Sequence, residues 1–226
     1  MAEKAFDAIL FDLDGTLMDT AVDMIHALAR LADNHRIDHQ LNIAEYRQYI
    51  SKGAVALVKS VFNDPSAERL EQLRLEYLEI YQQQLNTHSH LFNGVAELLS
   101  HLDQTDTPWG IVTNKPSWLA RPIVANTTQL ARSQVLICAD EVGVAKPDPK
   151  PLLTAAGHMA LNHSSTLYLG DARSDIDAAH AAGMQSGIAL WGYLAPDDEP
   201  DDWLAHHRFE TPLELLKHQS PDNTNS

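Results

Sequence analysis

Two aspartates directly follow an apolar segment near the start of the chain. Residues 6–11 are Phe-Asp-Ala-Ile-Leu-Phe, and Asp12 and Asp14 come next with one residue between them. On a strand, residues two apart point to the same side, so the two carboxylates should lie close together. Desolvated carboxylates repel each other, and a bound divalent cation removes that cost. The pair therefore predicts a metal site. Helix capping by one aspartate without a metal is the plainer alternative.

Two further carboxylates follow a later apolar run. Asp171 and Asp175 come after residues 166–169, which are Thr-Leu-Tyr-Leu. Four carboxylates form an all-oxygen ligand set, which suits Mg²⁺ better than zinc. We therefore expect Mg²⁺ as the cofactor.

An anion site is expected beside these carboxylates. Thr113 and Asn114 follow a third apolar run and offer a hydroxyl, an amide and backbone N–H groups where a helix could begin. Lys146 starts the rigid turn 146–149, Lys-Pro-Asp-Pro, and could supply a fixed positive charge. Helix capping and a solvated lysine are the alternatives. A carboxylate–Mg²⁺ site next to an anion pocket suits phosphoryl transfer.

Other phosphate and acyl chemistries lack their motifs. The sequence contains neither a GxxxxGK[ST] loop nor a GxSxG turn. The first absence leaves nucleotide hydrolysis by a P-loop unsupported, and the second leaves serine-hydrolase chemistry unsupported.

The elements that must position these residues alternate between strands and helices. This alternation predicts an α/β fold with a parallel sheet, in which ligands bind at the carboxyl ends of the strands. The predicted strands are 6–11, 109–112, 135–139, 166–169 and 186–190. The predicted helices between and after them are 95–102, 118–126, 150–161, 176–182 (closed by Gly183) and 213–218, with a frayed tail from Gln219.

A helical insertion interrupts this alternation after the first strand. Residues 18–86 are predicted to be wholly helical, with Thr20 and Asp23 as a capping box and with Asn42 and Ser66 as later helix caps. We therefore expect an α/β core formed by residues 1–17 and 87–226 and a helical cap formed by residues 18–86.

The composition excludes several kinds of partner. The chain has 226 residues, 44% of them hydrophobic, and a net charge of −15. This charge disfavours nucleic acids and anionic membranes, and no apolar run is long enough to span a bilayer. Cys138 is the single cysteine, so a disulfide within the chain is impossible and a cytoplasmic setting is expected. The acidic run 196–202 is interpreted as a solvated loop.

With these motifs in order, the chain resembles the haloacid dehalogenase superfamily of phosphatases. The matching stretches are 11–16, 113–114, 146–147 and 170–175. The resemblance implies a Rossmann-like parallel sheet with an inserted mobile cap that closes over the site. It also implies that Asp12 is the nucleophile and that Asp14 acts first as acid and then as base. An acid at position 14 matches expulsion of an alkoxide, so a phosphatase is favoured over a dehalogenase.

The resemblance also assigns the surrounding ligands. Thr113, Asn114 and Lys146 would hold the phosphoryl oxygens. Mg²⁺ would be held by the Asp12 side chain, the Asp14 backbone carbonyl and Asp171, with Asp175 close behind.

Within the superfamily, the chain resembles the phosphoglycolate phosphatase-like branch. Stretches 49–54, 108–116 and 189–203 are more similar to N-acetylmuramic acid 6-phosphate phosphatases, which act in peptidoglycan recycling. Phosphoglycolate phosphatases tend to carry Val-Gly where Ser51-Lys52 stands here. The expected partner is a small acidic phosphomonoester, first N-acetylmuramic acid 6-phosphate and alternatively phosphoglycolate. A phosphosugar mutase and a non-catalytic module are further alternatives, and a monomer or weak homodimer is expected.

Substrate choice is expected to depend on the cap. Ser51, Lys52 and Gly53 are predicted to lie on a loop facing the site, where Lys52 could meet a substrate carboxylate; an exposed cap loop without that role is the alternative. Arg173, two residues after Asp171, is a further candidate for substrate contact.

Overall fold

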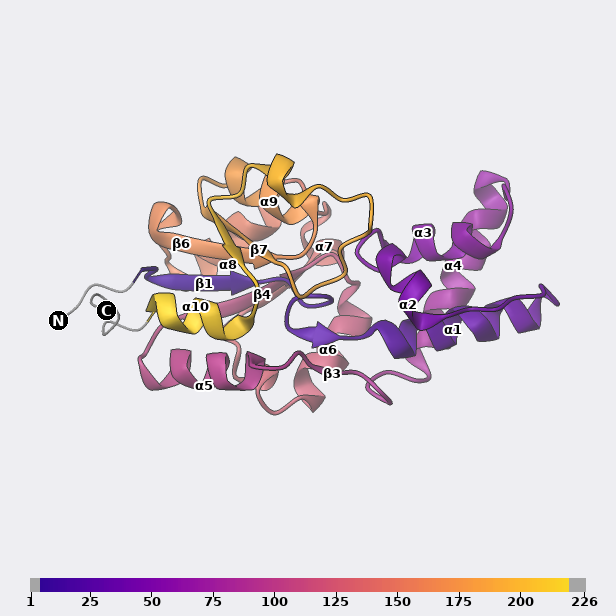
Figure 1. Ribbon diagram of the computed structural model, residues 1–226, viewed down its shortest axis with the longest axis horizontal. Helices are drawn as coiled ribbons and strands as arrows, with labels where there is room; N and C mark the ends of the chain where they lie inside the picture. The colour runs from indigo at the N-terminus through magenta and orange to yellow at the C-terminus, as the bar shows by residue number, and fades with distance from the viewer. Residues whose placement is uncertain (1–4, 220–226) are drawn as a thin grey trace.

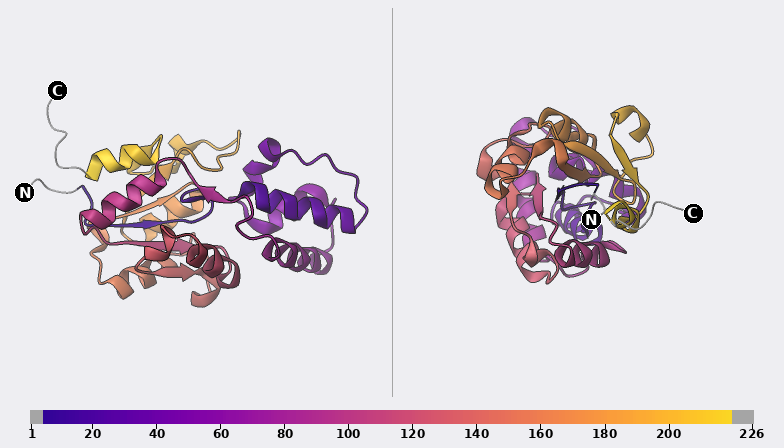
Figure 2. Two further views of the ribbon diagram at one scale, coloured as in Figure 1. Left: turned by 90° about the horizontal axis from the view of Figure 1, so that it is seen from below. Right: turned by 90° about the vertical axis from the view of Figure 1, so that its left-hand side faces the viewer.

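The computed structural model describes residues 5–219. Figure 1 shows an α/β core and, beside it, a cap composed of helices α1–α4, whose bounds are given below. Figure 2 shows a narrow junction between the two bodies, where the chain leaves the core and returns to it.

The core is built on a parallel sheet. Within residues 5–219 the sheet has six strands in the order β5-β4-β1-β6-β7-β8. All pairs are parallel, and Ile9 of the central strand lies opposite Trp109 on one side and Leu167 on the other. The strands are β1 (Ala8–Phe11), β4 (Trp109–Thr113), β5 (Leu136–Cys138), β6 (Thr166–Gly170), β7 (Gln185–Ala189) and β8 (His207–Phe209). The expected α/β fold with a parallel sheet is confirmed.

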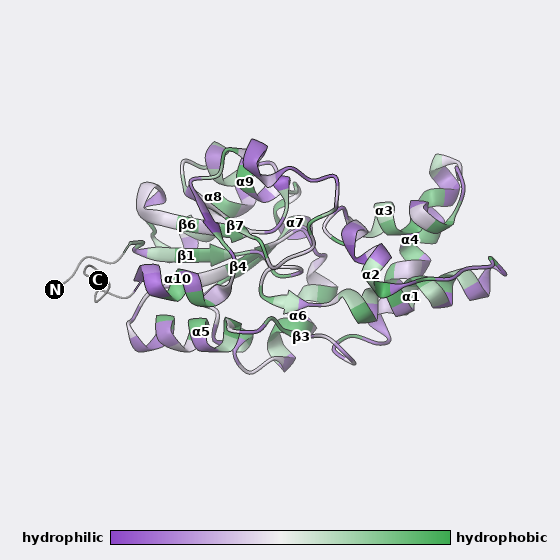
Figure 3. Cartoon of the chain, in the orientation of Figure 1, coloured by the Kyte–Doolittle hydropathy of each residue, from purple (hydrophilic) through white to green (hydrophobic). Residues whose placement is uncertain are grey.

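Two helical layers cover the sheet. Along β1, Ile9 and Phe11 belong to one apolar cluster and Leu10 to another, as the alternation of a strand requires. The first cluster includes residues of α5 (Val95–Gln104), α6 (Ser117–Asn126) and α10 (Pro212–Gln219). The second includes residues of α8 (Lys150–Met159) and α9 (Arg173–Ala181). Hydrophobic residues accordingly follow the strands and the sheet-facing sides of these helices in Figure 3.

The cap has an apolar core of its own. Its helices are α1 (Ala21–Asn34), α2 (Ile43–Tyr46), α3 (Gly53–Val61) and α4 (Ala67–Gln82), with a 3₁₀ turn at Arg47–Tyr49. Leu28, Leu57 and Tyr77 are fully buried among them. The predicted caps are confirmed, since Asn42 accepts from the Ala44 N–H and Ser66 accepts from the Arg69 N–H.

The junction differs from the prediction in two respects. The segment is not wholly helical, because β2 (Met18–Asp19) pairs antiparallel with β3 (His90–Leu91). The predicted capping box is also wrong. Thr20 makes no side-chain cap and instead donates from Oγ1 to Asp14 Oδ1 at 2.6 Å, while Asp23 accepts from residues of the returning chain. The cap boundaries at residues 18 and 86 stay a prediction.

Several smaller elements lie outside the predicted pattern. The sequence reasoning missed α7 (Ala139–Val142) and the edge strand β8. Gln219 is not frayed: its buried side chain exchanges hydrogen bonds of 3.0 Å with the backbone N–H and C=O of Phe6. The rest of the predicted tail, residues 220–226, lies outside the described residues. Within residues 5–219 no helix has the length and apolar character needed to cross a membrane.

Candidate active site

The site lies where three adjacent core strands end. Asp12 follows β1, and its N–H donates to the Leu169 carbonyl of β6 at 2.9 Å. Thr113 is the last residue of β4, and Asp171 directly follows β6. Because these strands are parallel neighbours, their carboxyl ends meet at one edge.

Three buried carboxylates gather at this edge. One oxygen from each of Asp12, Asp171 and Asp175 lies within 4.8 Å of the others. Glycines allow the backbone to pass close to two of them. A Cβ on Gly15 would lie 2.3 Å from Asp171 Oδ2, and a Cβ on Gly170 would lie 2.2 Å from Asp175 Oδ2. Side chains at these two positions would therefore displace the carboxylates.

Burial sets the charge balance of this three-carboxylate group. It raises the pKa of Asp12 to about 6, and the pKa of Asp171 lies well above its ordinary value because of burial and the neighbouring charges of Asp12 and Asp175. Lys146 Nζ lies 2.8 Å from Asp12 Oδ1 and 2.7 Å from Asp175 Oδ1. Burial opposes the charge of Lys146, but these two carboxylates raise its pKa above the ordinary value. A cluster of buried oxygen donors whose burial and mutual repulsion disfavour ionisation fits a hard divalent cation such as Mg²⁺.

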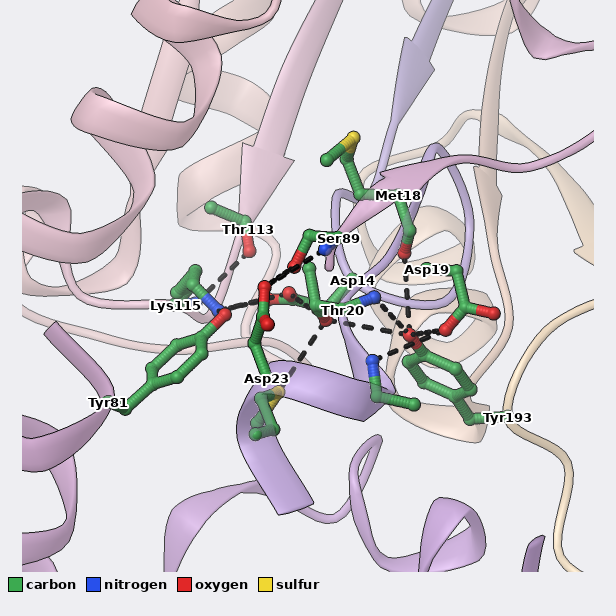
Figure 4. Close-up of polar contacts among 12 residues, drawn as sticks. Asp14, Met18, Asp19, Thr20, Asp23, Tyr81, Ser89, Thr113, Lys115 and Tyr193 are labelled. Atoms are coloured by element: carbon green, nitrogen blue, oxygen red, sulfur yellow. Dashed lines mark hydrogen bonds and ion pairs between the residues drawn. The ribbon is translucent and has the colours of Figure 1, made fainter. Parts of the chain in front are cut away.

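Asp14 has different partners from the three-carboxylate group. Its Oδ1 accepts from Thr20 Oγ1 at 2.6 Å, and Lys115 Nζ lies 3.0 Å from Oδ1 and 3.1 Å from Oδ2. Figure 4 shows Lys115 reaching Asp14 and the hydroxyl of Tyr81, which belongs to cap helix α4. The resemblance assigned the Asp14 backbone carbonyl, not its side chain, to the metal, and that assignment stays a prediction.

Core and cap together enclose a cavity of about 120 Å³. Both Asp12 and Asp14 line it, although only Asp12 of the pair belongs to the three-carboxylate group. The other core residues that line it are Thr113, Asn114, Lys115, Pro116 and Leu119. The cap contributes Met24, Ile50, Ser51, Gly53, Ala54, Leu78 and Tyr81.

Two of the three predicted anion-binding residues, Asn114 and Lys146, contact each other. Thr113 Oγ1 accepts from the Lys115 N–H at 3.1 Å. The Asn114 amide bridges the backbone of Lys146, accepting from its N–H at 2.9 Å and donating to its carbonyl at 3.1 Å. Helix α6 begins only at Ser117, so Thr113 and Asn114 precede the helix by a short turn. Thr113 and Asn114 line the cavity with Asp12, and Lys146, which is not among the lining residues, has Nζ 2.8 Å from Asp12.

The cap candidates do not all reach the cavity. Ser51 and Gly53 line it, and Ser51 Oγ donates to the Tyr193 carbonyl at 3.2 Å. Lys52 is not among the lining residues. Its side chain is 45% exposed, and Nζ lies 3.9 Å from Asp197, in the largely exposed acidic run 196–202. Arg173 is also absent from the lining, is 62% exposed and faces Asp177 at 3.7 Å.

Sequence reasoning missed the second half of the site. Lys115, Thr20 and Tyr81 surround Asp14, and Tyr193 holds the junction by accepting from the Thr20 N–H at 2.6 Å. One signal was available for Lys115, which directly follows Thr113 and Asn114 and precedes a proline. Tyr81 occupies an apolar helical stripe, which indicates packing and not a polar contact.

Comparisons with known proteins show which family the chain belongs to. Residues 9–189 match the haloacid dehalogenase-like hydrolase family model. The chain is 43% identical to N-acetylmuramic acid 6-phosphate phosphatase of Pseudomonas putida, over 93% of this chain and 94% of that protein. It is 40% identical to phosphoglycolate phosphatase of Xanthomonas campestris, over 92% of this chain and 94% of that protein.

Solved structures share the fold. A predicted phosphoglycolate phosphatase from Haemophilus somnus aligns with a TM-score of 0.84 at 22% identity, covering 96% of this chain and 99% of that one. A haloacid dehalogenase-like protein from Streptococcus pneumoniae aligns with a TM-score of 0.82 at 20% identity, over 96% and 99%. With the family match and the identities to phosphatases over most of its length, the chain belongs to the haloacid dehalogenase-like hydrolase family, as one of its phosphatases.

Proposed function

We propose that the chain is a Mg²⁺-dependent phosphomonoesterase that forms an aspartyl-phosphate on Asp12. The observation that carries this proposal is the double placement of Asp12. Its carboxylate lines the cavity together with Asp14 and also belongs to the three-carboxylate group. A nucleophile needs access to substrate, and a metal-binding carboxylate needs neighbouring oxygens, and this position offers both.

The reaction has two displacements at phosphorus. In the first, an Asp12 oxygen attacks the phosphorus, the bond to the leaving oxygen breaks, and Asp14 gives that oxygen a proton. In the second, Asp14 takes a proton from water, which attacks the phosphorus of the aspartyl-phosphate. The bond to Asp12 then breaks, and inorganic phosphate leaves with both aspartates restored.

The remaining residues bind and orient the phosphoryl group. Thr113, Asn114 and Lys146 would hold its oxygens, and the 2.8 Å distance between Lys146 Nζ and Asp12 Oδ1 supports this role for Lys146. Asp12, Asp171, Asp175 and the Asp14 backbone carbonyl would hold Mg²⁺. The bound ion would neutralise charge on the phosphoryl oxygens and on the clustered carboxylates.

A covalent phosphoenzyme is the direct test of this mechanism. Enzyme mixed with p-nitrophenyl phosphate and Mg²⁺ is quenched in acid within one turnover and digested, and the peptide containing Asp12 is analysed by mass spectrometry. We expect the mass of one added phosphoryl group on that peptide, with Asp12→Asn as the control lacking it. Rapid phosphate release without phosphoenzyme would overturn the Asp12 role.

For the substrate, we propose a small acidic sugar or organic-acid phosphate in the cytoplasm. N-acetylmuramic acid 6-phosphate, and with it peptidoglycan recycling, is the first choice because the Pseudomonas putida relative carries that name. Phosphoglycolate is the second, supported by the Xanthomonas campestris relative. Measuring kcat/KM with Mg²⁺ for both compounds and for simple hexose phosphates separates these choices. An isomerised sugar phosphate in place of free phosphate would indicate a mutase.

The role of the cap loop in this choice is also a proposal. Lys52 would contact the substrate carboxylate after moving from its place near Asp197. Lys52→Ala should then lower kcat/KM for the acidic substrate much more than for p-nitrophenyl phosphate. Equal losses would remove Lys52 from substrate selection.

A further inference from the structure

Lys115 is a buried lysine for which neither the predicted metal site nor the predicted anion site has a use. It lies in the turn after β4 with 8% of its surface exposed. Its Nζ lies 3.0 Å from one oxygen of Asp14 and 3.1 Å from the other. Contact with both oxygens fixes the plane of the carboxylate as well as its position.

The cap holds this lysine in place. Tyr81 of α4 accepts a hydrogen bond from Lys115 Nζ at 3.0 Å, and the ammonium lies 4.5 Å from the centre of the same ring. An ammonium has three hydrogens, and three oxygen atoms surround it here. Lys115 is thereby committed to Asp14 and Tyr81, whereas Lys146 already provides a cation beside Asp12.

We propose that Lys115 is the positioning residue for the proton transfer by Asp14, and that Tyr81 makes this positioning depend on contact with the cap. The inference rests on the acid role given to Asp14 in the proposed function. Figure 4 shows the arrangement, with Thr20 at the start of the cap holding Asp14 from a second side. A cap that moves away takes Tyr81 with it, so the acid is ordered when the cap covers the cavity.

Leaving groups of different basicity test this role. An alkoxide leaves only with a proton, while p-nitrophenolate leaves without one. kcat/KM reports the steps up to leaving-group departure, so it isolates the proton transfer from the later attack of water. A positioning residue for the acid should therefore matter for a sugar 6-phosphate and matter little for p-nitrophenyl phosphate.

The central variant is Lys115→Met, which keeps an unbranched side chain as far as Cε and removes the ammonium. We expect kcat/KM to fall about 100-fold for the sugar 6-phosphate and only a few-fold for p-nitrophenyl phosphate. Tyr81→Phe keeps the ring and removes the hydroxyl. It should therefore lower kcat/KM for the sugar 6-phosphate about 5-fold more than kcat/KM for p-nitrophenyl phosphate. Lys59→Met, at an exposed cap lysine away from the cavity, is the matched control and should leave kcat/KM for both substrates unchanged.

Equal losses on the two esters would overturn the inference, because they would mean that Lys115 binds the phosphoryl group. No loss on either would overturn it as well. Circular dichroism and thermal unfolding establish that each variant folds, and should Lys115→Met not fold, Tyr81→Phe carries the test alone.

Asp14→Asn separates the two levels of the argument. If Asp14→Asn lowers kcat/KM equally for the sugar 6-phosphate and for p-nitrophenyl phosphate, the proposed acid role fails. If Asp14→Asn lowers kcat/KM more for the sugar 6-phosphate than for p-nitrophenyl phosphate and Lys115→Met does not, the positioning role alone fails. In the double variant with Asp14→Asn and Lys115→Met, the second substitution should lower kcat/KM for the sugar 6-phosphate by no more than about 3-fold, because both substitutions act on one proton transfer.

Discussion

The two lysine–aspartate contacts of the site are built from different parts of the molecule. Lys146 contacts Asp12 and Asp175, and all three belong to the α/β core. Lys115 contacts Asp14, and that contact includes Tyr81 from a cap helix. The first lies within the core, whereas the second includes a residue of the cap.

The difference indicates that the three-carboxylate group and the junction have different roles. In the three-carboxylate group, burial and crowding raise the pKa of Asp12 and of Asp171, and a bound cation would relieve the repulsion between these carboxylates. At the junction the polar groups already have partners: Tyr193 accepts from the Thr20 N–H at 2.6 Å and donates to Asp19 at 2.9 Å. The core group is therefore expected to bind the metal and supply the nucleophile, and the junction to place the cap and, with it, Asp14.

The largest expected effect comes from the core. Asp12→Asn removes the proposed nucleophile and should lower kcat for p-nitrophenyl phosphate at least about 1,000-fold without unfolding the chain. Asp177→Asn, at a 45% exposed aspartate of α9, is the matched control. Substantial turnover by Asp12→Asn would break the comparison, because the core group would then not carry the chemistry.

The second prediction is that Mg²⁺ acts through the three-carboxylate group and not through the junction. Chelation should abolish phosphate release, and added Mg²⁺ should restore it. Binding should also stabilise the fold by about 2.7 kcal/mol when Mg²⁺ is present at 100 times its dissociation constant. Thermal unfolding with and without Mg²⁺ measures this gain. Asp171→Asn should reduce the gain, whereas Tyr81→Phe at the junction should keep it, and the reverse pattern would contradict the assignment of the metal.

A junction variant is expected to act on stability. Tyr193→Phe leaves the buried Thr20 N–H without its 2.6 Å acceptor and should lower the free energy of unfolding by about 1–3 kcal/mol. Denaturant unfolding measures the change, with Tyr46→Phe, at a half-buried cap tyrosine, as the control. An unchanged free energy of unfolding would mean that the Tyr193 hydroxyl does not stabilise the junction.

The core half of the site could be predicted from sequence because strand order and strand ends determine it. Apolar runs indicate where β1 and β6 end, and a parallel sheet brings those ends together, so Asp12 and Asp171 had to meet. Their contact needs no knowledge of side-chain packing. The edge strand β8 escaped prediction because its residues, His-Arg-Phe, show no apolar run.

The junction half depends on contacts that local sequence does not encode. Thr20 is a good helix-capping residue, but the turn at Gly15, whose N–H donates to the Met18 carbonyl at 3.0 Å, brings Asp14 within reach of its hydroxyl. Lys115 and Tyr81 are 34 positions apart, and their contact follows from how α4 packs over the core. Lys52, by contrast, looked like a cavity residue, and its place beside Asp197 depends on a loop more than 140 positions away.

The smallest expected effect is a pH dependence that belongs to the junction alone. Asp23 is buried, which by itself would raise its pKa, but hydrogen bonds from Ser89 and His88 outweigh burial and lower it. A carboxyl with a lower pKa in the folded state adds stability above its unfolded value of about 3.9 and loses it as the pH falls through the folded value. The difference in unfolding free energy between the wild type and Asp23→Asn should therefore shrink as the pH falls from about 5 toward about 3. Denaturant unfolding across this range measures it, with Asp7→Asn, an exposed aspartate of the core, as the control. A difference that grows on acidification would show that these hydrogen bonds do not favour the charged carboxylate, and the junction would then lose its distinction from the core group.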